Sequence, residues 1–127
     1  MKVLHITSEL SKKNFSIASI IIFITKYLNS YYSYKYSILS SKSEIDLFKD
    51  KNIHEIEFRS WNSIFLKIKN LSRYIENFDV IHIHGIWAPI QIFSIILCNF
   101  KKKNYVIHPH GMLLKEALRS AGFLKFL

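Results

Sequence analysis

Two segments of the sequence end an apolar run with the motif His-x-His-Gly. They are FDVIHIHGIWAPI at residues 78–90 and NYVIHPHGMLLKEAL at residues 104–118. In each, the glycine permits a tight turn in which the backbone approaches a ligand closely. A helix that starts beyond the glycine would offer an anion its unpaired N–H groups and the positive end of its dipole. One such ending is consistent with chance, but two indicate a site.

The histidine directly before each glycine is the stronger candidate for a ligand contact. His84 precedes Gly85 and His110 precedes Gly111, so each ends its apolar run, where few structural roles are left for it. A histidine inside an apolar run is more often a hydrogen-bonded core residue. That structural role is expected, taking each singly, for His5, His54, His82 and His108.

Two His-x-His pairs also have a spacing that can hold a metal ion. Neutral imidazoles alone, however, make an incomplete hydrolytic site, and no carboxylate is close in sequence to either pair on the correct end. Asp79 stands at the start of its apolar run, which places it at the opposite edge of a sheet. The sequence therefore predicts no metal site, and a histidine-metal hydrolase stays open as a weaker alternative. No Walker loop, nucleophile elbow or Gly-x-Gly-x-x-Gly motif is present.

The apolar runs alternate in length, which predicts strands separated by helices. Short runs rich in β-branched and aromatic residues predict five strands, at residues 2–8, 34–40, 52–58, 78–84 and 104–110. Longer runs, or apolar residues with the helical period, predict helices at residues 15–29, 61–75, 89–100 and 112–121. The first of these helices is so continuously apolar that we expect it to be buried over most of its surface.

Strands joined through helices pair in parallel with right-handed crossovers. The predicted fold class is therefore α/β, a Rossmann-like parallel sheet with helices on both faces. In such a sheet, ligands bind outside the carboxyl ends of the strands. Because residues two apart in a strand face the same side, the histidines of both motifs should cluster at that end of the sheet.

The chain has 127 residues, half of them apolar, which is the length and composition of one globular domain. The net charge of +9 comes almost wholly from scattered lysines, and no RNA-binding or helix-turn-helix signature accompanies it, so nucleic acid is not an expected partner. An anionic membrane surface suits this charge better, although the apolar runs at 17–24 and 85–100 are too short to cross a membrane. A lone Cys98 and the lack of a signal-peptide pattern predict a cytoplasmic protein, or one at the inner face of the plasma membrane.

The segments MKVLHITSEL, FDVIHIHGIWAPI and YVIHPHGMLLKEAL, in this order and at these separations, resemble the N-terminal domain of glycosyltransferase family 4. Members of this family are retaining GT-B enzymes common in bacterial lipopolysaccharide, capsule and exopolysaccharide synthesis. The resemblance covers most of the chain. It implies two facing Rossmann-like domains with the active site in the cleft between them. The N-terminal domain carries acceptor contacts, and the C-terminal domain binds the nucleotide-sugar donor.

The resemblance also implies roles for particular residues. His110 matches the family histidine near the donor sugar and the reaction centre, a catalytic position, and Gly111 matches the glycine after it. His84 and Gly85 match the strand ending that lines the cleft, and Trp87 matches part of the acceptor wall, with a packing role as the alternative. Retaining chemistry of this kind needs no protein-bound metal, and no cofactor is expected.

Two features depart from the family pattern. The loop after the first strand, SELSKKNFS, is not rich in glycine, and no glycine stands between Met1 and Gly85. In addition, residues 1–127 are expected to form an incomplete N-terminal, acceptor-side domain, with the C-terminal donor domain and its acidic motif absent.

The expected function is thus the N-terminal part of a glycosyltransferase, inactive by itself. The whole enzyme would move a sugar from a nucleotide-sugar donor to a glycan or lipid-linked acceptor. The alternative from another class is a non-catalytic half-transferase subunit, which docks a donor domain or an anionic membrane through its basic surface.

Overall fold

A computed structural model describes residues 1–44, 51–58 and 62–120 of the chain. Its centre is a sheet of five parallel strands in the order β3-β2-β1-β4-β5. The strands are β1 (Lys2–Leu10), β2 (Lys35–Ser43), β3 (Ile53–Glu55), β4 (Val80–His84) and β5 (Asn104–His108). The predicted α/β fold class is confirmed, and each of the five expected strands is present.

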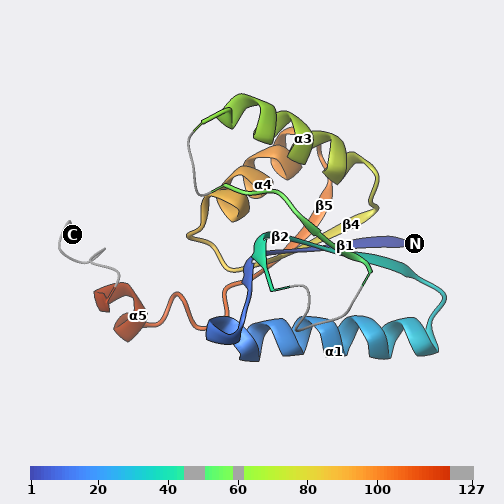
Figure 1. The fold of residues 1–127 in the computed structure, drawn as a ribbon, viewed down its shortest axis with the longest axis horizontal. Helices are drawn as coiled ribbons and strands as arrows, with labels where there is room; N and C mark the ends of the chain where they lie inside the picture. The colour runs from blue at the N-terminus through green and yellow to red at the C-terminus, as the bar shows by residue number, and fades with distance from the viewer. Residues whose placement is uncertain (45–50, 59–61, 121–127) are drawn as a thin grey trace.

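Helices cover both faces of the sheet, as predicted. A short 3-10 turn, η1 (Lys12–Asn14), leads into α1 (Phe15–Tyr31), which lies on one face. The other face carries α3 (Ile64–Glu76) and α4 (Pro89–Phe100), and Figure 1 shows these two helices above the sheet with α1 below it. A last short helix, α5 (Lys115–Ser120), follows β5. The start of the helix expected at 61–75 lies partly outside the described residues.

Strand alternation divides the core into two apolar layers. On the side of α3 and α4, buried Leu4, Ile6, Ile81 and Ile83 pack with Cys98. On the other side, residues of β1, β2 and β3 pack against α1, with Val3, Leu10, Ala18, Ile21 and Ile38 at the centre. Burial raises the pKa of the Cys98 thiol to about 11, so Cys98 is the small buried hydrophobe that its apolar run predicts.

The prediction that α1 is buried over most of its surface is wrong. Only Ala18, Ile21 and Thr25 are buried, a stripe with the helical spacing of three and four residues. Around it, Phe15, Ile20, Phe23, Ile24, Tyr27 and Tyr31 are exposed. A helix that packs on only one layer buries one stripe, whatever the apolar content of its other faces.

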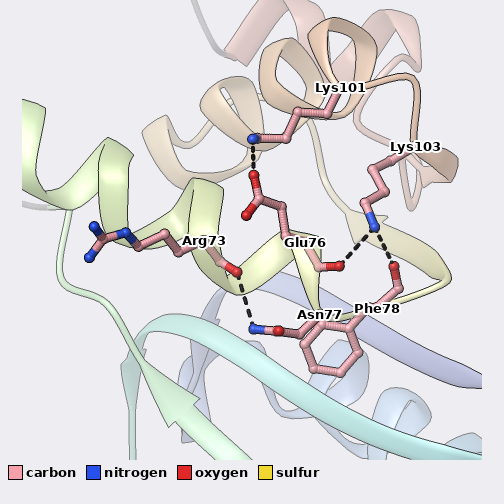
Figure 2. Close-up of polar contacts among 6 residues, drawn as sticks. All are labelled: Arg73, Glu76, Asn77, Phe78, Lys101 and Lys103. Atoms are coloured by element: carbon pink, nitrogen blue, oxygen red, sulfur yellow. Dashed lines mark hydrogen bonds and ion pairs between the residues drawn. The ribbon is translucent and has the colours of Figure 1, made fainter.

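The lysines that follow α4 fasten α3 to the sheet, as Figure 2 shows. Lys101 forms an ion pair with Glu76, and the Lys103 Nζ donates to the carbonyl oxygens of Glu76 and Phe78, both at 2.9 Å. These contacts hold the end of α3 beside the turn that enters β4. The one cluster of lysines in the sequence, Lys101–Lys103, therefore has a structural use. No helix among the described residues has the length and apolar character needed to cross a membrane.

Candidate functional site

Strand register brings the histidines of three strands together on the face of the sheet that carries α1. His5 of β1 is the register partner of His82 on β4, and His84 is the partner of His108 on β5. Ile81 and Ile83 point the other way, into the core under α3 and α4. The prediction that the two motifs present their histidines on one side is therefore confirmed, but the cluster extends along the sheet face as well as to its carboxyl end.

Three ring-to-ring hydrogen bonds link the five residues His5, His82, His84, His108 and His110, here called the histidine cluster. The His5 Nδ1 lies 3.0 Å from the His84 Nε2, and the His84 Nδ1 lies 2.9 Å from the His110 Nε2. A separate pair joins the His82 Nδ1 to the His108 Nε2 at 2.9 Å. Neighbouring rings stack with centroids 4.8 to 5.3 Å apart. His5, His82 and His108 are each hydrogen-bonded, as expected, whereas the core role expected for His54 is wrong, because His54 lies exposed on β3.

Burial favours the neutral form of four histidines of the cluster, His5, His82, His84 and His110. Desolvation and the neighbouring imidazoles lower the pKa of His5 to about 3 and that of His84 to about 2. The pKa values of His82 and His110 are also lowered, again mainly by desolvation and then by His108. At pH 7 these side chains are therefore uncharged, and each can donate one hydrogen bond and accept another.

The cluster forms the floor of a cavity of about 500 Å³. Ile20, Ile24 and Leu28 of α1 form one wall, and Tyr32 and Tyr34 lie beyond the end of that helix. His5 and His84 are almost fully buried at 5% and 6% exposure, whereas His110 is exposed. The cavity therefore combines apolar walls with neutral donors and acceptors, a combination typical of sites for uncharged polar ligands.

Both motif glycines have a backbone conformation that favours glycine. Gly85 has a φ of 99° and Gly111 a φ of 78°, and His110 itself adopts the left-handed region with a φ of 47°. This region is uncommon for residues with a side chain. These two successive left-handed residues follow the end of β5 at His108, and in this turn the His110 ring lies against His84.

The side chain of Gln91 fills the space next to Gly85, so a ligand cannot approach the backbone there. The Gln91 Nε2 donates to the His84 carbonyl at 2.6 Å, and the Gln91 Oε1 accepts from the Ala88 N–H at 2.9 Å. A Cβ atom on Gly85 would lie 2.3 Å from that Nε2. One N–H group expected to meet an anion at the start of α4 is therefore already used by Gln91, a residue that the sequence patterns did not single out.

Trp87 lies in the loop between β4 and α4 and is 43% exposed. It is not among the residues that line the histidine cavity. Gly85 and Gly111 likewise shape the turns beside the cavity without lining it. Of the five residues singled out from the sequence, the structure brings His84 and His110 into direct contact.

A second hollow, of about 360 Å³, lies at the carboxyl ends of β1 and β2. Its lining includes Ser8 and Glu9 near the end of β1, Ser41 of β2, Phe58, and Ala88, Pro89 and Ile90 at the start of α4. This is the edge where ligands of parallel α/β sheets bind. The one sequence signal for this hollow is the polar segment SELSKKNFS, expected as a loop, whose first three residues extend β1 in the structure.

The histidine geometry does not suit a metal ion. Among the residues that the structure describes, no three or more His, Cys, Asp or Glu side chains are placed so as to hold one. The facing nitrogens of the histidines are hydrogen-bonded to one another, and Asp79 lies at the amino edge of the sheet, where it accepts from the Lys2 N–H at 2.6 Å.

Comparison with known proteins defines the fold class and no narrower group. Neither protein-family models nor curated proteins give a match to the chain. The fold is similar to a crystal structure reported as that of a UDP-N-acetylglucosamine 2-epimerase from Listeria monocytogenes, with a TM-score of 0.58 and 11% sequence identity. The match covers 84% of this chain and 29% of that one, so the chain spans less than a third of its length. The likeness supports a GT-B-like Rossmann fold.

Proposed function

We propose that this chain is the N-terminal, acceptor-side part of a retaining GT-B glycosyltransferase of the family 4 type. It would act with a donor-binding domain on a nucleotide sugar and a glycan or lipid-linked acceptor. The observation that carries the proposal is the hydrogen-bonded histidine cluster, which ends in an exposed His110 at a largely apolar cavity. The order and spacing of the two His-x-His-Gly motifs, and the similarity of the fold to an enzyme named for a nucleotide-sugar substrate, support it further.

The chemistry of a sugar suits this cavity. Sugar hydroxyl groups are uncharged donors and acceptors, and a neutral imidazole can meet either role without a charge that would have to be desolvated. His110 is held by His84 through one ring nitrogen and by a left-handed backbone, so its ring has a fixed direction. Strained backbone of this kind is concentrated at functional sites. In the proposal, His110 orients the sugar, while the donor domain stabilises the charge that develops on the departing diphosphate.

The proposal is tested by comparing the glycosyltransferase activity of the chain alone with that of the chain fused to a donor-binding domain. With a panel of nucleotide sugars, we expect no release of nucleoside diphosphate from the 127-residue chain alone, because it supplies one wall of the cleft. The chain joined to a GT-B donor-binding domain should release it in the presence of acceptor. His110→Ala should lower kcat/KM of the joined protein about 100-fold.

The matched control is His54→Ala, since His54 is exposed on β3 outside the cavity. It should leave turnover unchanged. Turnover by the chain alone, or full activity of His110→Ala, contradicts the proposal. A joined protein that folds and binds donor without transfer would favour the non-catalytic subunit.

The exposed face of α1 favours a second proposal, that the chain docks on an anionic membrane. Phe23, Tyr27 and Tyr31 are exposed and form successive ring contacts, with centroids 6.1 and 4.7 Å apart. Residues 12–35 contain four lysines and no carboxylate. Lys26 lies on α1, and the other three lie next to its two ends. Exposed aromatic rings with lysines nearby are typical of helices that lie in a membrane interface.

Vesicle sedimentation tests the docking. The chain should sediment with vesicles that contain phosphatidylglycerol and not with vesicles of phosphatidylcholine alone. Salt near 1 M should release it, because the screening length then falls to about 3 Å. Phe23→Ser should weaken binding, whereas Phe65→Ser, an exposed aromatic on the opposite layer in α3, should not. Equal binding to both vesicle types would count against it.

A further inference from the structure

Three histidines form a continuous chain of hydrogen bonds from the sheet interior to the exposed edge of the cavity. The His5 Nδ1 meets the His84 Nε2 at 3.0 Å, and the His84 Nδ1 meets the His110 Nε2 at 2.9 Å. His84 thus uses both ring nitrogens, one toward each neighbour. The pair of His82 and His108 has its own single bond and does not interrupt this chain.

The chemistry of neutral imidazole allows this histidine chain two arrangements. A neutral ring carries one N–H donor and one acceptor nitrogen. If His5 donates from Nδ1, His84 accepts at Nε2 and must donate from its own Nδ1, so His110 accepts at Nε2 and carries its proton on Nδ1. In the opposite arrangement, all three rings carry the proton on Nε2. Any mixture of the two tautomers loses at least one of the two hydrogen bonds.

We infer that His5 and His84 are positioning residues that couple the tautomer of His110 to their own, so that whether its Nδ1 donates to or accepts from a ligand hydroxyl depends on the two interior rings. In the first arrangement the His110 Nδ1 is a donor, and in the second it is an acceptor. The consequence for a sugar rests on the proposed function, whereas the coupling of the three rings rests on the hydrogen-bond geometry alone. A buried residue remote from the exposed edge then sets the chemistry presented there.

Neutrality of the buried rings is a condition for this coupling, and the structure meets it. A doubly protonated ring has two donors and no acceptor, so protonated His84 could not accept from His5 or His110. Burial disfavours the charged form of both interior rings, and their pKa values lie far below 7. A buried donor or acceptor left without a hydrogen bond is destabilising, which favours the two matched arrangements over the mixed ones.

Nitrogen-15 NMR of the 127-residue chain at pH 7 tests the inference. Ring nitrogen shifts identify the protonated nitrogen of each histidine, and couplings across N–H···N bonds identify the linked pairs. We expect the same nitrogen to be protonated in His5, His84 and His110, with couplings between both linked pairs. Opposite tautomers in His84 and His110, or no coupling between them in the folded chain, would overturn it.

Variants extend the test and compare two neighbours of His5. His84→Leu should change the tautomer population of His110, whereas His82→Leu, which removes a ring stacked on His5 at 5.0 Å but no link of the chain, should leave it unchanged. An equal shift in both variants would indicate a general loss of packing and contradict the inference. These measurements involve no sugar or donor domain, so a negative result for the tautomers leaves the proposed function standing. Conversely, if the three tautomers match but the protein fused to a donor domain is inactive, only the proposed function is contradicted.

Discussion

At pH 5 the protein is expected to be about 4 kcal/mol less stable than at pH 7, because His5 and His84 are buried in their neutral form. Their native pKa values are about 3 and about 2, against 6.5 for the model side chain. Between pH 6.5 and 3 the unfolded chain therefore binds two more protons than the native one, so stability falls as the pH falls. Each histidine contributes about 2 kcal/mol at pH 5, since one pKa unit corresponds to about 1.4 kcal/mol.

Urea unfolding at pH 7 and pH 5 measures this loss, and both pH values lie above the ordinary pKa values of carboxyl groups. His5→Gln should remove about half of the difference between the two pH values. The matched control, His54→Gln, changes an exposed histidine and should leave the difference intact. Equal stability of the wild-type chain at both pH values would show that the interior rings are charged or accessible in the native state.

Gly85→Ala is expected to destabilise the chain by about 4 kcal/mol. Part of the cost is backbone strain, since a φ of 99° lies outside the regions that a residue with a side chain prefers. The larger part comes from Gln91, whose Nε2 would lie 2.3 Å from the new Cβ. Moving this buried amide leaves the His84 carbonyl and the Ala88 N–H without their partner. Thermal or chemical unfolding measures the change.

Gly111→Ala provides the matched control, because its φ is also positive but the nearest atom to a new Cβ is the Leu114 Cδ1 at 3.4 Å. Its cost should be about 1 kcal/mol, from strain alone. The double variant Gly85→Ala with Gln91→Ala should cost less than the sum of its single changes, because both act on the same contact. Equal effects of the two glycine variants would refute the role assigned to Gln91.

The end of β4 and the two glycine turns could be predicted from sequence because their signals are local, whereas β5 ends at His108 and not at the predicted His110. The turns at Gly85 and Gly111 have the positive φ values that the glycines indicate. Alternation within β4 also correctly placed His82 and His84 on one face. These inferences require only the period of a strand and the conformational preference of glycine.

Inferences that depend on a partner element were less secure. The continuous apolar run of α1 hides its buried stripe of Ala18, Ile21 and Thr25, because the sequence does not reveal which helix faces meet another layer. Likewise, the links of His5 to His84 and of His84 to His110 depend on strand register and on a left-handed turn at His110. Gln91 carries no motif at all, and its function follows only from its place beneath Gly85.

The strand order also has a consequence for synthesis. Strand β1 is made first but lies in the middle of the sheet, between β2 and β4, and its pairing with β4 joins Val3–Thr7 to Val80–His84. At about 5–20 residues per second, the roughly 70 residues between these strands take about 4 to 14 s to translate. During that time one edge of β1 lacks its native neighbour. The nascent chain must therefore keep this central edge of β1 from pairing with other strands until β4 emerges.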